Sequence, residues 1–276
     1  MIEVKNLSKS FGKLDVLRDL SFKVEEGEVA LILGRNGVGK TTLYNLMLGN
    51  LQKDGGEISI SGLKPEKDYV KIKEIVGFMP EESYFYENWT LEENLNFIRK
   101  FFRNWDKEKE KELLEKFKLE KKQKLSNLNK GAKRKLSLLV SLCHNAKVFF
   151  FDEPLSGIDP IFREEILYSI IEEIQSKGGT FLISSHFLEE LENIGTYLIF
   201  LKEGKIEIEG KIEYLREYFG LLEIEEGQKE PENLKILKEK RTGNKKIIYC
   251  QKITEGEIKF QQFLTLNEIF KILLKE

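Results

Sequence analysis

An apolar pentapeptide that runs into a glycine-rich turn constrains this 276-residue chain more than any other feature. Residues 29–33 (Val-Ala-Leu-Ile-Leu) carry no polar side chain, which is typical of a strand buried on both faces of a parallel sheet. The turn 34–41 reads Gly-Arg-Asn-Gly-Val-Gly-Lys-Thr and fits the pattern GxxxxGK[ST]. A helix-like stretch over 41–48 follows. The order strand, glycine turn, helix predicts an α/β fold.

The glycine turn also predicts a phosphate site. Glycines let successive backbone N–H groups point inward around an anion, at a helix N-terminus whose dipole favours negative charge. Lys40 is placed to reach the β- and γ-phosphates, and the Thr41 hydroxyl can bind Mg²⁺. A chance match in a chain of this length is roughly a 1% event. We therefore expect the chain to bind a nucleoside triphosphate.

Two more apolar strands end in polar side chains that suit this chemistry. The strand Val148–Phe151 leads to Asp152, a carboxylate suited to Mg²⁺. Glu153 follows and could polarise an attacking water as a general base. The strand 180–184 leads to His186, which should lie near the γ-phosphate because strand ends face the ligand crevice in such sheets. A polar strand end without a role, and a purely structural histidine, are the alternatives.

Composition mainly excludes other classes. The 45 Lys+Arg and 47 Asp+Glu give a net charge of −2, so charge gives no reason to expect a nucleic acid partner. Cys143 and Cys250 form no CxxC pair, which argues against a disulfide framework and fits a reducing cytoplasm. The start, 1–5, has no signal-peptide pattern, and no uncharged apolar run approaches about 18 residues. We expect a soluble chain that does not span a membrane by itself.

The patterns along the chain predict its organisation. Alternating apolar residues over the first 30 positions indicate strands, and residues 197–209 indicate a closing hairpin. Helical patterns fill the middle: Thr90–Glu93 is a capping box, and the charged stretch 106–124 predicts an exposed amphipathic helix. Beyond it, Asp159-Pro160 supplies a helix N-cap and first-turn proline.

The pattern changes after about Gly220. The remaining residues alternate in short segments, end in an amphipathic helix near 266–274, and carry no catalytic motif. We expect one domain over 1–220, with a helical subdomain at about 84–146, and a small accessory unit over 221–276.

Taken together, the motifs resemble the ATP-binding subunit of ABC transporters, over roughly residues 1–215. In that resemblance Gly34–Thr41 is the Walker A motif and Val148–Asp152 is Walker B. Glu153 takes the catalytic-glutamate position and His186 that of the switch histidine. The resemblance implies a P-loop NTPase with a mixed, mainly parallel sheet, an N-terminal antiparallel β subdomain, a helical subdomain and a small C-terminal appendage.

The resemblance also implies further contacts. Phe11 matches the aromatic residue that stacks on adenine, and Leu155–Asp159 looks like the D-loop. The alternatives are an ordinary strand-end Phe and, for Asp159, an N-cap alone. The ATP contacts implied within the chain are Phe11, Gly34, Arg35, Asn36, Gly37, Val38, Gly39, Lys40, Thr41 and Thr42.

Two family motifs are altered. The signature LSGGQ reads Leu-Asn-Lys-Gly-Ala over 128–132, a register that supplies a glycine and, unlike 125–127, places basic residues after it. In the family this segment contacts ATP across a dimer interface; Asn129 can still donate from its amide, and Gly131 keeps the backbone approach. The Q-loop glutamine is Glu81, which could bind Mg²⁺ but adds negative charge. The implied Mg²⁺ ligands are Thr41, Glu81 and Asp152.

The resemblance implies a subunit that powers transport by ATP hydrolysis. The tail and the Pro80-Glu81 pattern look most like bacterial multidrug, antibiotic and lipid exporters, whose ATPase and permease are separate chains. Two ATP-binding subunits, identical or different, would close around ATP, with Asn129–Gly131 of one covering the Walker A motif of the other. The implied location is cytoplasmic, on the inner face of the cell membrane.

Three alternative functions stay open. A soluble ABC-type ATPase of DNA repair or translation would carry coiled-coil insertions or two such domains, and neither is present. A switch GTPase would need Asn-Lys-x-Asp, and residues 129–132 lack the Asp. A weakly hydrolytic ATP-binding regulator would fit the altered signature and the tail.

Overall fold

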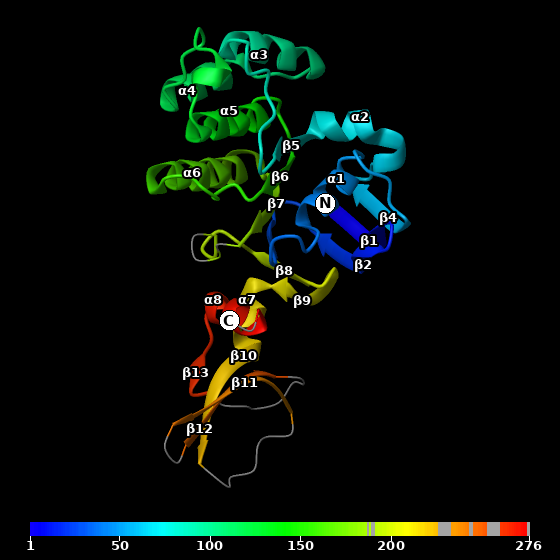
Figure 1. The fold of residues 1–276 in the computed structure, drawn as a ribbon, viewed down its shortest axis with the longest axis vertical. Helices are drawn as coiled ribbons and strands as arrows, with labels where there is room; N and C mark the ends of the chain where they lie inside the picture. Colours follow the sequence, from blue (N-terminus) through cyan, green and yellow to red (C-terminus); the bar gives the residue numbers. More distant parts are fainter. Residues whose placement is uncertain (187, 189–190, 226–232, 243–244, 253–259, 275–276) are drawn as a thin grey trace. The chain divides into compact units, whose positions relative to one another are not determined.

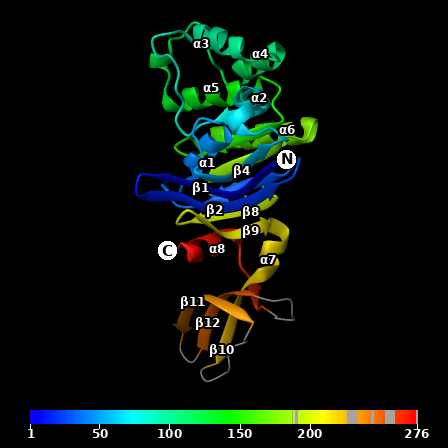
Figure 2. The ribbon, with the colours of Figure 1, turned by 90° about the vertical axis from the view of Figure 1, so that its right-hand side faces the viewer.

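The computed structural model describes residues 1–186, 188, 191–225, 233–242, 245–252 and 260–274 (Figures 1 and 2). The chain divides into two compact units. The first comprises Met1–Phe187 and Tyr197–Glu209, and the second comprises Leu188–Thr196 and Gly210–Glu276. Every candidate site residue lies in the first unit. The boundary that we predicted between a domain over 1–220 and an accessory unit over 221–276 stays a prediction.

A six-stranded sheet forms the centre of the first unit, in the order β5-β6-β7-β3-β8-β9. The strands from β5 to β8 pair in parallel, and every residue of β3, β6 and β7 is buried, as the continuous apolar runs predicted. The strands are β3 Val29–Leu33, β5 Val76–Met79, β6 Val148–Asp152, β7 Thr180–Ser185, β8 Tyr197–Lys202 and β9 Lys205–Lys211.

The expected hairpin closes this sheet at β8 and β9. Its two connecting residues, Glu203 and Gly204, both have positive φ, 51° and 75°. Two consecutive left-handed residues are the mark of a type I′ turn, whose twist matches that of antiparallel strands. The sheet is therefore mixed but mainly parallel.

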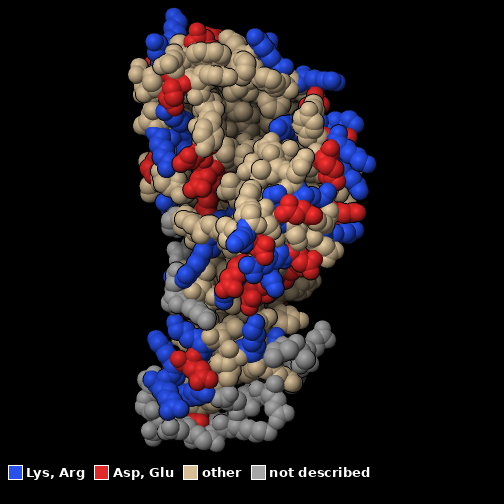
Figure 3. Space-filling model, turned by 45° about the vertical axis from the view of Figure 1, so that its right-hand side comes forward, with Lys and Arg blue, Asp and Glu red and all other residues tan. Residues whose placement is uncertain are grey.

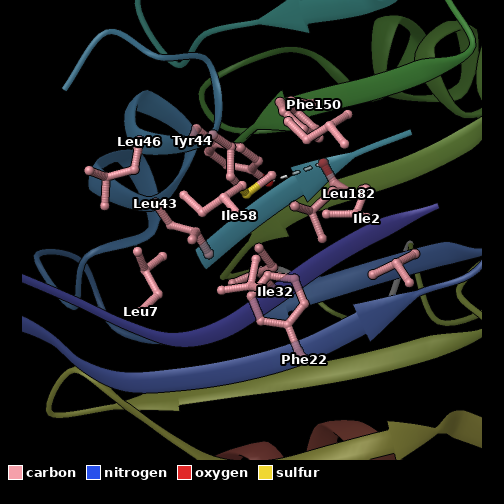
Figure 4. Close-up of a cluster of buried hydrophobic side chains, with 14 of the residues drawn as sticks. Ile2, Leu7, Phe22, Ile32, Leu43, Tyr44, Leu46, Ile58, Phe150 and Leu182 are labelled. Atoms are coloured by element: carbon pink, nitrogen blue, oxygen red, sulfur yellow. Dashed lines mark hydrogen bonds between the residues drawn. The ribbon is translucent and has the colours of Figure 1, made fainter. Parts of the chain in front are cut away.

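The N-terminal part of the first unit forms an antiparallel sheet in the order β2-β1-β4. Its strands are β1 Ile2–Phe11, β2 Leu14–Val24 and β4 Gly55–Ile60. The predicted alternation holds, since Ile2 pairs with Val24 and Val4 with Phe22, and all four side chains are buried. Figure 4 shows the core between this sheet, helix α1 (Lys40–Met47) and the central sheet.

Tyr44 of helix α1 fixes that helix on the central sheet. Its ring lies 5.7 Å from that of Phe150, and its hydroxyl is 3.2 Å from Phe151 O and 3.1 Å from Leu182 O. Burial raises the pKa of Tyr44 well above its ordinary value, so the hydroxyl stays protonated. One side chain thus ties the helix after the glycine turn to both β6 and β7.

Helices occupy the middle of the chain, as predicted. The capping box at Thr90 is present, with Thr90 Oγ1 accepting from Glu93 N and the Glu93 carboxylate accepting from Thr90 N. The helix expected over 106–124 is shorter, because Lys118 takes a left-handed backbone with φ 54° and ends it. The helices are α1 Lys40–Met47, α2 Pro65–Ile75, α3 Leu91–Ile98, α4 Lys107–Lys116, α5 Lys130–Leu142 and α6 Pro160–Lys177, with 3₁₀ turns η1 Arg99–Phe101 and η2 Leu125–Asn127.

The second unit has its own antiparallel sheet, in the order β11-β12-β10-β13. A small buried cluster lies on it, made of Leu222, Ile224, Ile248 and Cys250. The predicted last helix is present as α8. The elements are α7 Ile212–Tyr218, β10 Phe219–Glu225, β11 Leu234–Thr242, β12 Lys245–Lys252, β13 Gln262–Phe263 and α8 Leu266–Leu273. Within the described ranges, no helix combines the length and apolarity needed to cross a membrane.

Candidate nucleotide site

The glycine turn between β3 and α1 requires its glycines. Gly37 and Gly39 have positive φ, 80° and 111°, and Gly39 is the N-cap of α1. A Cβ on Gly39 would lie 2.6 Å from Leu17 Cδ2, and one on Gly34 would lie 2.7 Å from Leu201 O. Only glycine fits these positions, so the backbone amides at the start of α1 stay open to an anion.

A pocket of about 440 Å³ lies over this turn. It joins the turn to the end of β1, to the segment after β5 and to the end of β6. Its lining residues are Phe11, Val16, Asn36, Gly37, Gly39, Lys40, Thr41, Thr42, Glu81, Asp152 and Glu153. Of the residues predicted to bind the nucleotide within the chain, Gly34, Arg35 and Val38 lie in the same turn but outside the lining.

Asp152 is held in place by two hydroxyl groups. Its Oδ2 accepts from Thr41 Oγ1 at 2.7 Å, and its Oδ1 accepts from Ser184 Oγ at 2.6 Å. The carboxylate is 1% exposed. Paired carboxylate and hydroxyl oxygens beside a phosphate site are the donors that Mg²⁺ prefers, so these residues fit the ion. Among the described residues, no group of three or more His, Cys, Asp and Glu side chains is placed to hold a metal.

Glu153 faces a different set of partners. Its backbone is left-handed, with φ 48°, and its N–H donates to Ser184 Oγ at 2.9 Å. Its Oε2 lies 2.6 Å from His186 Nδ1 and accepts from the His186 backbone N–H at 3.2 Å. Its Oε1 lies 3.0 Å from Lys40 Nζ, an ion pair outside the angles of a hydrogen bond. The carboxylate is buried between a phosphate-reaching lysine and the predicted switch histidine.

Lys40 lies across the glycine turn. Its ammonium donates to Gly34 O at 2.7 Å, and the side chain is 6% exposed. This contact holds the ammonium group over the turn. Phosphate oxygens bound by the backbone amides would therefore lie next to it.

The altered signature lies at a second pocket. Asn129 is the N-cap of α5, with its Oδ1 accepting from Ala132 N at 2.8 Å, which leaves the amide N–H groups as donors. A Cβ on Gly131 would have no neighbour closer than 3.5 Å. Both residues line a pocket of about 480 Å³ together with Gly157 and Asp159. They do not line the pocket over the glycine turn. Asp159 is also the expected N-cap of α6.

Sequence reasoning missed three residues. Val16 lines the nucleotide pocket, Ser184 joins Asp152 to Glu153, and Arg134 binds the backbone of Glu153. Ser184 is a polar residue in a strand whose residues are all buried, and that was the available signal. Arg134 stands in a run of basic residues, where nothing distinguishes a buried cation from a solvated one.

Comparison with known proteins gives the family. The model of the family described as ABC transporter matches residues 17–156. The uncharacterized ABC transporter ATP-binding protein MJ1023 of Methanocaldococcus jannaschii is 31% identical over 98% of this chain and 97% of its own length. The lantibiotic transport ATP-binding protein SrtF of Streptococcus pyogenes is 33% identical over 82% of this chain and 95% of its own. A solved ATP-binding subunit of an ABC transporter superposes with a TM-score of 0.73 at 27% identity, covering 79% of this chain and 92% of that one. The chain belongs to the ABC transporter family, as an ATP-binding subunit with ATPase activity.

Proposed function

We propose that this chain hydrolyses Mg-ATP in the pocket over the glycine turn, with Glu153 as the general base. The observation that carries the proposal is the buried Glu153 carboxylate, 2.6 Å from His186 Nδ1 and 3.0 Å from Lys40 Nζ. A carboxylate held at the edge of a phosphate site is in position to take a proton from water.

Binding is divided among parts of the pocket. The amides at the start of α1 and the Lys40 ammonium hold the phosphates. Thr41 and Asp152 would hold Mg²⁺, with Glu81 in the same pocket as a further carboxylate, and the ion when bound neutralises phosphate charge. Phe11 is 48% exposed while lining the pocket, so an adenine ring has room to stack on it.

Hydrolysis follows from the placement of Glu153. Its carboxylate takes a proton from water as the water oxygen attacks the γ-phosphorus, and the bond from that phosphorus to the bridging oxygen of ADP breaks. The attraction of phosphate charge for Lys40 frees Glu153 Oε1 for this task. His186 holds the other carboxylate oxygen and fixes its direction. Lys40 and the amides of the turn stabilise the charge left on ADP.

A second ATP-binding subunit completes the site in this proposal. Asn129 and Gly131 line a pocket separate from that of the glycine turn. We therefore expect them to contact the nucleotide that is bound at the glycine turn of another chain. The side-chain amide N–H groups of Asn129 supply hydrogen bonds for phosphate oxygens. The partner is an identical or a related subunit.

The other partner that we propose is a separate transmembrane permease, which would hold this chain on the inner face of the membrane. Exposed aromatic side chains support a protein contact next to Glu81: Tyr84 is 86% and Tyr86 is 51% exposed, and Tyr86 stacks on Trp89. The relative named for lantibiotic transport supports a transport role, and export is the direction that we propose. On the face drawn in Figure 3, acidic and basic side chains are interspersed over the described residues of the first unit. Because nucleic acid binding needs a clustered basic surface, we expect no nucleic acid partner.

The substitution Glu153→Gln tests the proposed function. Turnover should fall by at least about 100-fold, roughly 2.7 kcal/mol of transition-state stabilisation, while ATP binding by calorimetry is retained. Glu120→Gln makes the same change on an exposed carboxylate outside the pocket and serves as the control. Turnover of Glu153→Gln close to wild type would exclude Glu153 as the base.

Light scattering of Glu153→Gln with Mg-ATP tests the proposed second subunit. It should show a shift from monomer to dimer.

A further inference from the structure

Arg134 is a buried cation that binds backbone rather than a carboxylate. It lies on α5 and is 2% exposed. One terminal nitrogen donates to Pro80 O at 2.5 Å and to Glu81 O at 2.7 Å, and the other donates to Glu153 O at 2.5 Å. Burial lowers the pKa of Arg134, but arginine remains a cation at neutral pH. A buried charge is costly, so its retention here calls for a role.

These acceptors lie just beyond the last paired residues of β5 and β6. Met79 is the last residue of β5 in register, opposite Phe151. Past this pair the strands separate, and the guanidinium of Arg134 joins them by binding carbonyls on both sides. One side carries Glu81, whose side chain lines the nucleotide pocket, and the other carries Glu153.

The backbone of Glu153 needs such support. A non-glycine residue with φ 48° is strained and keeps that conformation only where its surroundings impose it. Its N–H is held by Ser184 and its carbonyl by Arg134. The direction of the carboxylate depends on both contacts.

The segment after β5 is bound to α5 at a second point. Ser83 Oγ donates to Ser137 Oγ at 2.9 Å, and Ser137 lies one helical turn after Arg134. The start of α5 carries Asn129 as its N-cap. The helix that presents the altered signature therefore also holds the backbone of two pocket carboxylate residues, Glu81 and Glu153.

We propose that Arg134 is a positioning residue that sets Glu81 and Glu153 at the nucleotide pocket and transmits the position of α5 to them. This rests on the proposed role of Glu153. The planar guanidinium spans two strand ends, which a single ammonium group cannot do in the same geometry. Arg134 touches none of the reacting atoms, so its effect on hydrolysis passes through Glu153.

The variants Arg134→Lys and Arg134→Gln test this inference. Because the glycine turn is unchanged, the Kd for ATP should stay within about threefold of wild type, while kcat falls by about tenfold or more. The two variants leave different donors at the position, so a folding failure of one leaves the other to decide. Arg99→Lys is the control, since the Arg99 guanidinium is partly buried, at 22% exposed, and binds the Glu110 side chain, away from the pocket.

A double-mutant cycle with Glu153→Gln separates positioning from general loss of structure. Single-turnover hydrolysis of radiolabelled ATP should show that Arg134→Lys lowers the rate by less than about twofold in the Glu153→Gln background, because the group that it positions is already gone. The inference would be overturned if the rate losses of the two single variants multiplied in the double variant, or if kcat of Arg134→Lys equalled that of wild type. The role of Glu153 would stand in either case. Wild-type turnover in Glu153→Gln itself would overturn both.

Discussion

Two adjacent carboxylates have different surroundings because the backbone changes hand between them. Asp152 ends β6 and faces the hydroxyls of Thr41 and Ser184. Glu153 has φ 48° and faces Lys40 and His186. A single strand end thus supplies one carboxylate suited to binding a metal ion and one suited to accepting a proton from water. Such a division of roles by environment is how neighbouring acids perform different chemistry.

Ser184 links these two carboxyl residues and gives the residue-scale prediction. Ser184→Ala removes the donor to Asp152 Oδ1 and leaves the Glu153 N–H without its acceptor, both in a buried site. We expect a loss of about 1–3 kcal/mol in the free energy of unfolding and a higher Mg²⁺ concentration for half-maximal ATPase activity. Urea denaturation and a Mg²⁺ titration measure the two effects.

The control is Ser176→Ala, which removes an exposed hydroxyl that binds Glu172 O within α6. It should change stability by less than about 0.5 kcal/mol. A Ser184→Ala protein that matches this control in both measurements would show that Ser184 does not fix the carboxylates.

At the scale of elements, α5 combines two tasks. It presents Asn129 at its N-cap and carries Arg134 behind the pocket. Asn129→Ala removes the cap, so stability should fall by about 1 kcal/mol, whereas Asn129→Ser keeps a capping oxygen and should stay within a few tenths of wild type. Thermal unfolding followed by circular dichroism measures this difference.

The same pair of variants tests the contact across the proposed dimer. In the Glu153→Gln background, Asn129→Ala should need more ATP than Asn129→Ser to reach half-maximal dimer by light scattering, since only Ser retains a side-chain donor. Equal ATP dependence of the two would mean that residue 129 does not contact nucleotide.

The sequence predicted the elements whose signal is local. The apolar runs of β3, β6 and β7, the capping box at Thr90 and the glycine turn each depend on neighbours in the chain, and each is confirmed. The predicted end of α4 was wrong, because Lys118 takes a left-handed backbone although it is neither glycine nor asparagine. Arg134 could not be found because its acceptors lie 54, 53 and 19 positions away.

At the scale of the whole molecule, the two units contain one cysteine each, and both thiols are buried. Cys143 follows α5 in the first unit, and Cys250 lies on β12 in the second. Burial raises the pKa of both thiols, that of Cys250 to about 11, so neither reacts as a thiolate in the folded protein at neutral pH. Alkylation therefore reports the opening of each unit separately.

We expect Cys250 to be alkylated before Cys143 as urea is raised. Among the described residues, the buried cluster around Cys250 has four members. The unit that holds Cys143 contains a much larger buried cluster, part of which Figure 4 shows, and a small core opens at a lower free energy. Iodoacetamide labelling at increasing urea, read by peptide mass spectrometry, gives the two midpoints, and labelling in full denaturant shows that both sites react when exposed. Coincident midpoints would mean that the units unfold as one cooperative body, and earlier labelling of Cys143 would place the weaker core in the ATP-binding unit.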